Sequence, residues 1–151
     1  LDAAMKQRID KLIAVHVYVS KYSPRALHKV GRDEAAKIPP PALHPLVRVH
    51  SDNGRKYLYL NPVRMEAIIG MPDDESQALI AELMAHATQA KYEYRHAWRY
   101  GDMVIWDNTR VLHHATGSNP DQEREIHRTT IKGDHCHGWW EGQKKVEAVT
   151  A

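Results

Sequence analysis

Residues 101–134 read GDMVIWDNTRVLHHATGSNPDQEREIHRTTIKGD, and this stretch decides the fold that we predict from the sequence. It opens with the apolar strand MVIW and crosses a polar turn to the pair His113 and His114. It then returns as a second strand, which carries Arg124 and Arg128. Successive side chains of a strand point to opposite faces, so the two arginines are expected to share one face. The stretch therefore predicts a β-hairpin, with the residues upstream as its scaffold.

One histidine and two arginines at these positions suggest a site for a metal and acidic ligands. His113 precedes the arginines by 124 − 113 = 11 and 128 − 113 = 15 residues, and a neutral imidazole nitrogen binds transition metals. Guanidinium groups stay charged and offer a planar fork of donors that suits a carboxylate. We therefore expect a metal that chelates one acid while a second acid lies nearby. The alternative is that Arg124 and Arg128 are solvated cations on an edge strand, paired with Glu123 and Glu125.

Several motifs follow one another along the chain in a recognisable order. They are HPLVR at 44–48, WRYGD at 98–102, WDN at 106–108, HHA at 113–115 and an arginine-rich stretch that ends in GD at 133–134. This series resembles the taurine dioxygenase-like, or 2,4-dichlorophenoxyacetate dioxygenase-like, oxygenases that use Fe(II) and 2-oxoglutarate. The resemblance extends over nearly the whole chain.

The resemblance implies a role for four residues of this sequence. His113 corresponds to the distal iron ligand, and Arg124 to the residue that clamps the far carboxylate of 2-oxoglutarate. Arg128 corresponds to a residue that holds an acidic group of the substrate, and Trp106 to a wall of the pocket. Together they imply a site for Fe(II) with 2-oxoglutarate as co-substrate.

The identity of the histidine ligand depends on how one residue is aligned. In the family an arginine commonly follows Trp-Asp-Asn, whereas Thr109 intervenes here before Arg110. If Thr109 is an insertion, the ligand moves to His114. Ungapped counting and the alanine that follows the pair favour His113, and His114 stays the alternative.

The chain departs from the family in its first two metal ligands. The family's His-x-Asp/Glu pair, together with a threonine that helps to bind 2-oxoglutarate, normally lies upstream of a segment like residues 1–14. The sequence His50-Ser51-Asp52 fits that pattern, but Asp52-Asn53-Gly54 is a tight-turn signature between two short strands. We therefore interpret this stretch as a hairpin turn and the chain as the C-terminal half of such an enzyme.

The fold expected from the resemblance is mainly β with a helical insertion. It is a double-stranded β-helix, or jelly-roll, of which residues 1–151 form the C-terminal portion as a single domain fragment. Residues 20–41, with scattered charges and a run of prolines, predict a flexible lid or loop. The remaining elements expected from periodicity are a helix at 1–10, a strand at 12–19, a hairpin at 44–60, a helical turn at 63–69, a helix at 75–88 and a strand at 91–98.

The function implied is that of an Fe(II)- and 2-oxoglutarate-dependent dioxygenase. It hydroxylates a small anionic substrate, a carboxylate, sulfonate or sulfate, with O2, and releases succinate and CO2. Two alternatives remain: a non-catalytic, cupin-like module that binds an organic acid, and an inactive fragment of the enzyme.

Composition narrows the class of partner and the compartment. The formal net charge is only +2 and no basic stripe with interleaved aromatics occurs, so the sequence does not predict nucleic-acid binding. No apolar run approaches the roughly 18 residues of a membrane span. The single cysteine, Cys136, excludes an intrachain disulfide and favours a reducing compartment. We therefore expect a cytoplasmic protein, with its oligomeric state, a homo-oligomer included, left open.

Overall fold

The computed structural model describes residues 1–23, 38–117 and 119–131, and the backbone of residues 139–140. The elements in order are α1 (Ala3–Ile9), β1 (Ile13–His16), β2 (Ala42–Pro45), β3 (Val47–Val49), β4 (Lys56–Leu58), β5 (Met65–Ile68), α3 (Asp73–Ala87), the 3₁₀ helix η1 (Ala90–Tyr92) and β6 (Trp139–Trp140). None of the helices within these ranges is long and apolar enough to cross a membrane. The fold is mainly β with few helices.

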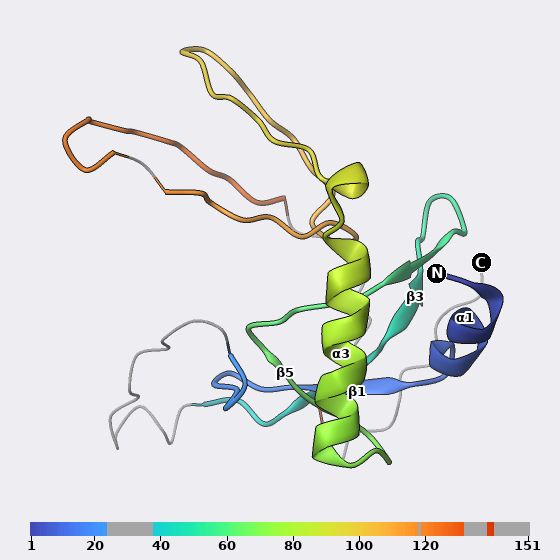
Figure 1. Cartoon of the computed structure of the whole chain (residues 1–151). Coiled ribbons are helices and arrows are strands. Elements are labelled where there is room, and N and C mark those ends of the chain that lie inside the picture. Colours follow the sequence, from blue (N-terminus) through green and yellow to red (C-terminus); the bar gives the residue numbers. More distant parts are fainter. Residues whose placement is uncertain (24–37, 118, 132–138, 141–151) are drawn as a thin grey trace.

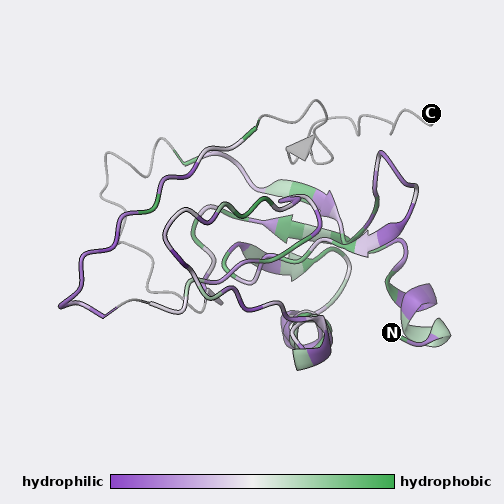
Figure 2. Ribbon diagram, turned by 90° about the horizontal axis from the view of Figure 1, so that it is seen from above, coloured by the Kyte–Doolittle hydropathy of each residue, from purple (hydrophilic) through white to green (hydrophobic). Residues whose placement is uncertain are grey.

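The strands form two antiparallel sheets. One has four strands in the order β5-β1-β2-β6, and the other pairs β3 with β4. In the larger sheet Ala14 lies opposite His44 on one side and opposite Ile68 on the other. The helix α3 lies alongside the larger sheet, whose central strands carry many apolar residues (Figure 2). This layered arrangement encloses the core.

The core is built from aliphatic side chains, as expected of a chain that contains no phenylalanine. Its buried members are Ile9, Ala14, Leu46, Leu60, Met65, Ile68, Leu79, Ile80 and Leu83. They come from both α-helices, from β1 and β5 of the larger sheet, and from the residues that flank the β3–β4 hairpin. Burial of such side chains is the main favourable contribution to folding, at about 25 cal/mol for each Å² of apolar surface removed from water.

Both α-helices follow from local signals in the sequence. The carboxylate of Asp2 caps α1 by accepting the backbone N–H of Met5 at 2.8 Å. The helix α3 begins with Asp73, Asp74 and Glu75, whose negative charges suit the positive end of the helix dipole. The predicted helices at 1–10 and 75–88 are therefore confirmed, with ends shifted by one or two residues.

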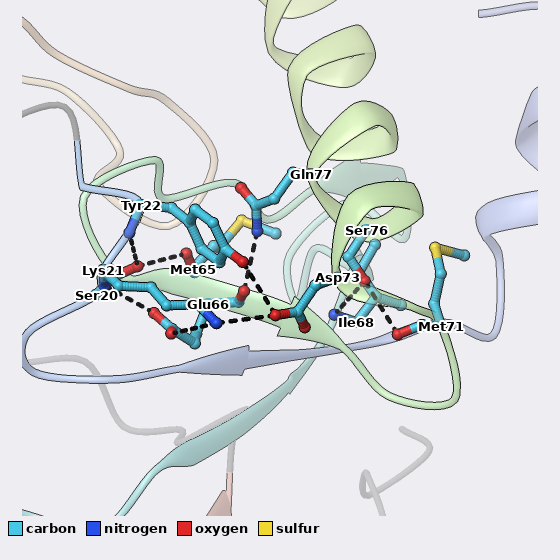
Figure 3. A network of polar contacts seen from close by, with 10 residues as sticks. All are labelled: Ser20, Lys21, Tyr22, Met65, Glu66, Ile68, Met71, Asp73, Ser76 and Gln77. Atoms are coloured by element: carbon cyan, nitrogen blue, oxygen red, sulfur yellow. Dashed lines mark hydrogen bonds and ion pairs between the residues drawn. The ribbon is translucent and has the colours of Figure 1, made fainter.

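A polar network ties the start of α3 to the chain that leaves β1 (Figure 3). Lys21 Nζ lies 2.8 Å from Asp73 Oδ2, and the hydroxyl of Tyr22 donates to the same oxygen at 3.0 Å. These contacts lower the pKa of Asp73, with the Lys21 hydrogen bond as the largest cause. The backbone N–H of Lys21 also donates to Glu66 Oε2 at 3.1 Å. The network fixes residues 20–23, where the predicted lid or loop begins, but residues 24–37 of that segment lie outside the described residues.

The helical turn predicted for residues 63–69 is wrong, because the structure forms strand β5 there. β5 pairs with β1, where His16 lies opposite Met65 after a register shift. The side chain of Asn61 accepts the backbone N–H of Val63, so Pro62 belongs to a turn rather than to a helix start. A short apolar run does not distinguish a helix from a strand, and pairing with a neighbouring strand decides the outcome here.

The strand predicted for residues 91–98 and the hairpin strands predicted within 101–134 are also absent from the described residues. After η1 the chain runs out in two long arms beyond the end of α3 (Figure 1). The turns of a hairpin are present, since Asp102 N–H donates to Arg99 O at 3.1 Å and Gln122 N–H to Asn119 O at 3.2 Å. Within the part of the chain that the structure describes, the segments between these turns have no ladder partner. Without such a partner, alternation alone does not produce a strand.

The arms carry apolar side chains into solvent. Met103 is 82% exposed, Ile105 85% and Ile131 91%. Large exposed apolar surface is typical of a surface that another polypeptide segment covers. Residues 94–131 therefore contribute little to the core of this chain.

Candidate active site

The turn at residues 107–111 holds the Trp-Asp-Asn motif against the β3–β4 hairpin. Asp107 Oδ1 accepts the backbone N–H of Thr109 at 2.9 Å and its hydroxyl at 2.6 Å. Asp107 Oδ2 lies 2.8 Å from His50 Nε2. The backbone N–H groups of Arg110 and Val111 both donate to the carbonyl of Asp107 at 3.3 Å. One carboxylate thus shapes the turn and joins it to the sheet.

These hydrogen bonds lower the pKa of Asp107 to about 2, with the Thr109 hydroxyl as the largest cause and His50 as the second. Asp107 is therefore ionised, and its Oδ2 accepts a hydrogen bond from His50 Nε2. The backbone N–H of Asp52 donates to His50 Nδ1 at 3.2 Å, which leaves the imidazole proton on Nε2. The link is a hydrogen bond from the His50 imidazole to a carboxylate. It also confirms that His50 and Asp52 belong to a hairpin turn, in which Gly54 has φ of 66°.

The structure brings together two of the residues predicted for the site, Trp106 and His113. Their ring centroids lie 5.3 Å apart at an interplanar angle of 49°. The indole N–H of Trp106 points to Asn108 Oδ1 at 3.4 Å, which limits how the indole rotates. Both His113 and His114 are exposed, and within the described residues the ring contact of Trp106 is with His113. The ring contact thus involves His113 and not the alternative.

Arg124 and Arg128 are exposed, on a segment that does not form the predicted strand. Their predicted shared face, which depends on that strand, is consequently not formed. Across the described ranges, no hydrogen bond, ion pair or ring contact joins either arginine to His113. The ion pair present on this segment links Glu125 to His127, with 2.9 Å between Oε1 and Nε2, rather than to either arginine. Nor does any described carboxylate pair with Arg124 or Arg128.

His113, Arg124 and Arg128 fit one metal-ligand position and the carboxylate-binding positions of the expected iron site. A three-ligand site of two histidines and a carboxylate needs these groups close together, and no group of three or more His, Cys, Asp or Glu side chains gathers within the described ranges. His113 suits a single ligand position because its imidazole makes no hydrogen bond to a described residue. Arg124 and Arg128 suit carboxylate binding because their guanidinium groups have no acidic partner among the same residues.

Sequence reasoning missed a buried polar cluster of His16, His44, Arg48 and Tyr59. His16 and Arg48 are 7% and 8% exposed. The guanidinium carbon of Arg48 lies 3.3 Å from the centroid of the Tyr59 ring, and Arg48 Nη2 is hydrogen-bonded to His44 Nδ1. The rings of His16 and Tyr59 stack with centroids 5.4 Å apart. The sequence carried a signal for this, because Arg48 alternates with two valines in a strand that buries one face.

The cluster places charge and polar nitrogen atoms in a dry environment. Burial lowers the pKa of His16 to about 3, and electrostatic interactions with His44 and Arg48 add to the effect. Within the described residues, His16 Nε2 and Arg48 Nε are buried without a hydrogen-bond partner. His16 is thus packed inside the fold. It stays neutral at ordinary pH.

Comparison with known proteins gives a family match. The profile described as "Taurine catabolism dioxygenase TauD, TfdA family" matches residues 1–130. The alpha-ketoglutarate-dependent 2,4-dichlorophenoxyacetate dioxygenase of Burkholderia sp. (strain RASC) is 42% identical over 108 residues, which are 72% of this chain and 36% of that protein. The (S)-phenoxypropionate/alpha-ketoglutarate-dioxygenase of Sphingobium herbicidovorans is 34% identical over 139 residues, 89% of this chain and 48% of that protein. The chain thus spans a third to a half of the length of these relatives.

Solved structures agree with the sequence matches. The crystal structure of AAD-2 in complex with Mn(II) and N-oxalylglycine superposes with a TM-score of 0.57 at 30% identity, covering 66% of this chain and 38% of that one. The crystal structure of a taurine dioxygenase from Burkholderia xenovorans has a TM-score of 0.51 at 31% identity, covering 67% of this chain and 30% of that one. The fold of this chain therefore corresponds to part of these structures.

Proposed function

The chain belongs to the TauD, TfdA family, and on this premise we propose that it is part of a dioxygenase that depends on Fe(II) and 2-oxoglutarate. Its substrate is a small anion, a carboxylate, sulfonate or sulfate, which it hydroxylates with O2. One oxygen atom enters a C–H bond of the substrate, and the other enters the succinate formed when 2-oxoglutarate loses CO2.

The observation that carries this proposal is the extent of the family match. Residues 1–130 include all the residues to which the sequence resemblance gives a role: Trp106, His113, Arg124 and Arg128. The contact between Trp106 and His113 supports it, because a neighbouring indole limits the orientations of the imidazole. The guanidinium groups of Arg124 and Arg128 support it as well, since neither has an acidic partner among the described residues and each can bind an acidic ligand.

Each of these residues has a separate task. His113 holds the metal through a neutral ring nitrogen, and Fe(II) with 2-oxoglutarate supplies the oxidising chemistry when bound. Arg124 binds the far carboxylate of 2-oxoglutarate through two parallel N–H···O bonds, which fixes the orientation of the co-substrate. Arg128 binds the anionic group of the substrate. Trp106 walls the pocket on the side of His113.

We further propose that residues 1–151 form the C-terminal portion of a jelly-roll, as a single domain fragment. Polypeptide outside this chain would then pair with residues 94–131 and cover apolar side chains such as Met103 and Ile105. It would also supply the remaining metal ligands. The hairpin turns at 99–102 and 119–122 support this proposal, because they are already formed without the ladder.

The proposal is tested by measuring succinate formed from 2-oxoglutarate by the intact protein. Fe(II) and ascorbate are supplied with a panel of aryloxy carboxylates, alkyl sulfates and sulfonates, and reactions without Fe(II) are the control. We expect succinate above the control with at least one class of substrate. If no class raises succinate while 2-oxoglutarate still binds, the protein binds organic acids without catalysis and the proposal is wrong.

A further inference from the structure

A small cleft lies where the β3–β4 hairpin meets the turn at residues 107–111. It measures about 180 Å³ and is lined by His50, Arg55, Lys56, Tyr57 and Arg110. We propose that this cleft binds a small tetrahedral oxyanion, such as sulfate or phosphate, between Arg55 and Arg110. The site uses neither His113 nor the two arginines of the proposed active site, so it does not depend on the proposed function.

The charge of the cleft is the first argument. Lys56 is paired with Asp10, and His50 is hydrogen-bonded to the carboxylate of Asp107. These two acidic groups leave the guanidinium groups uncompensated. Among the residues that the structure describes, the side chains of Arg55 and Arg110 make neither an ion pair nor a hydrogen bond. Two unpaired guanidinium groups at one cleft repel each other and attract an anion. A bound anion offsets this repulsion.

The rigidity of the cleft walls is the second argument. The backbone N–H of Arg55 donates to Asn53 Oδ1 at 3.0 Å, which fixes the hairpin turn. On the opposite wall, the backbone N–H of Arg110 donates to the carbonyl of Asp107 at 3.3 Å. The His50 to Asp107 hydrogen bond of 2.8 Å joins the two walls, and the His50 side chain is only 11% exposed. The arginine backbones are therefore held in place before a ligand arrives, which reduces the entropy lost on binding.

The size and chemistry of the cleft indicate the class of ligand. A water molecule takes about 30 Å³ of liquid volume, so the cleft has room for about six waters. That volume suits a small oxyanion with part of its hydration shell and excludes a drug-sized ligand, which needs roughly 300 Å³ or more. Planar guanidinium forks match the oxygen atoms of phosphate and sulfate in pairs. Tyr57 and Lys56 line the same cleft.

Isothermal titration of the intact protein with sodium sulfate, at constant ionic strength set by chloride, tests this proposal. We expect one saturable site. Arg55→Gln and Arg110→Gln should each weaken sulfate binding about tenfold or more, the usual range for loss of a charged hydrogen-bond donor. Arg110→Lys should bind with intermediate affinity, because it keeps the charge and loses the fork. Circular dichroism of each variant without sulfate confirms that the fold is kept.

Arg95→Gln is the matched control, because it removes the same charge from an exposed arginine that pairs with Glu93. We expect it to bind sulfate as the wild type does. Heats no larger than those of the chloride blank would overturn the proposal. Equal loss of sulfate affinity in Arg95→Gln and Arg110→Gln would also overturn it, because it would indicate a general charge effect. Unchanged sulfate binding in Arg55→Gln and Arg110→Gln would mean that the anion binds elsewhere, and the proposal would be wrong. Anomalous scattering from selenate provides a second readout, with a peak expected between Arg55 and Arg110.

Discussion

His50 Nε2 lies 2.8 Å from Asp107 Oδ2, across a separation of 57 residues in sequence. This hydrogen bond attaches the turn that precedes His113 to the β3–β4 hairpin. The rest of the arm from residue 111 to 117 forms no ladder. The position of the proposed iron ligand thus depends on a contact between the hairpin turn and a motif from the far end of the chain.

Removing the charge of Asp107 should change how stability depends on pH. The pKa of Asp107 falls from its ordinary value of 3.8 to about 2 in the folded protein. The ionised group therefore stabilises the fold above its unfolded pKa, and this contribution is lost as pH falls through the folded value. Between about pH 4 and pH 2, the wild type should lose more stability than Asp107→Asn. Because the side chain is 40% exposed, solvent screening limits the difference to below about 1 kcal/mol.

Urea unfolding, followed by circular dichroism between about pH 4 and pH 2, measures this effect. Asp121→Asn is the matched control, because the Asp121 side chain is exposed and has no partner within the described ranges. The control should follow the wild type. If the free energy of unfolding of Asp107→Asn depends on pH as that of the wild type does, the ionised carboxylate does not stabilise the fold.

Substitution of Arg124 and substitution of Arg128 should affect different kinetic parameters. Arg124→Gln should weaken 2-oxoglutarate binding by about 2 kcal/mol or more, as expected when one partner of a hydrogen-bonded charge pair is removed. Arg128→Gln should impair use of the anionic substrate and leave the affinity for 2-oxoglutarate nearly intact. Each variant is the control for the other, and the KM values of both ligands are the measurement. Equal losses for both ligands in both variants would contradict the assigned roles.

Replacement of each histidine of the pair should identify the metal ligand. His113→Ala should weaken Fe(II) binding by more than about 100-fold, because outer-shell partners of metal ligands already contribute 10- to 100-fold. His114→Ala should bind Fe(II) nearly as the wild type does, since the Trp106 ring contacts His113. Metal affinity is read by equilibrium dialysis. The opposite result would move the ligand to His114 and would make Thr109 an insertion.

The buried His16 should destabilise the fold as pH falls. Its pKa is lowered from 6.5 to about 3, so below pH 6.5 the unfolded chain binds a proton that the folded chain excludes. The free energy of unfolding is therefore unaffected by this group above about pH 6.5. Below that pH it falls toward pH 3, by up to about 1.4 kcal/mol for each pH unit. His16→Gln should flatten this slope even if it lowers stability at pH 7, because the amide does not titrate.

The measurement for His16 is the free energy of unfolding in urea at several pH values between 7 and about 4. His114→Gln, at an exposed position, controls for the loss of one histidine and should keep the slope of the wild type. An equal slope in His16→Gln and the wild type would mean that His16 is solvated in solution, contrary to its 7% exposure.

The elements that sequence alone predicted well are those with local determinants. The Asp2 cap, the acidic start of α3 and the turn before Gly54 each specify their own structure through short-range contacts. The predicted hairpin at 44–60 formed as β3 and β4, where Val47 lies opposite Leu58. In contrast, β5 depends on pairing with β1, and residues 94–131 depend on partners that the described chain does not supply.

Sequence motifs propose the residues of the candidate site but do not determine its geometry. Motif order singled out Trp106 and His113, and their contact at 5.3 Å agrees with a common environment. Nothing local positions Arg124 and Arg128 against His113, because that requires a strand ladder across the arms. The contact of His50 with Asp107, and the cluster around Arg48, were missed because each joins segments far apart in sequence.

Incorporation of labelled oxygen shows whether the intact protein couples turnover of 2-oxoglutarate to O2. The intact protein is supplied with ¹⁸O₂, Fe(II), 2-oxoglutarate and an anionic substrate that supports turnover, and the succinate is analysed by mass spectrometry. A dioxygenase of the proposed kind places a single ¹⁸O atom in each succinate, and His113→Ala forms no labelled succinate above the level without protein. Succinate that carries no label, or labelled succinate formed equally by His113→Ala, would contradict the account.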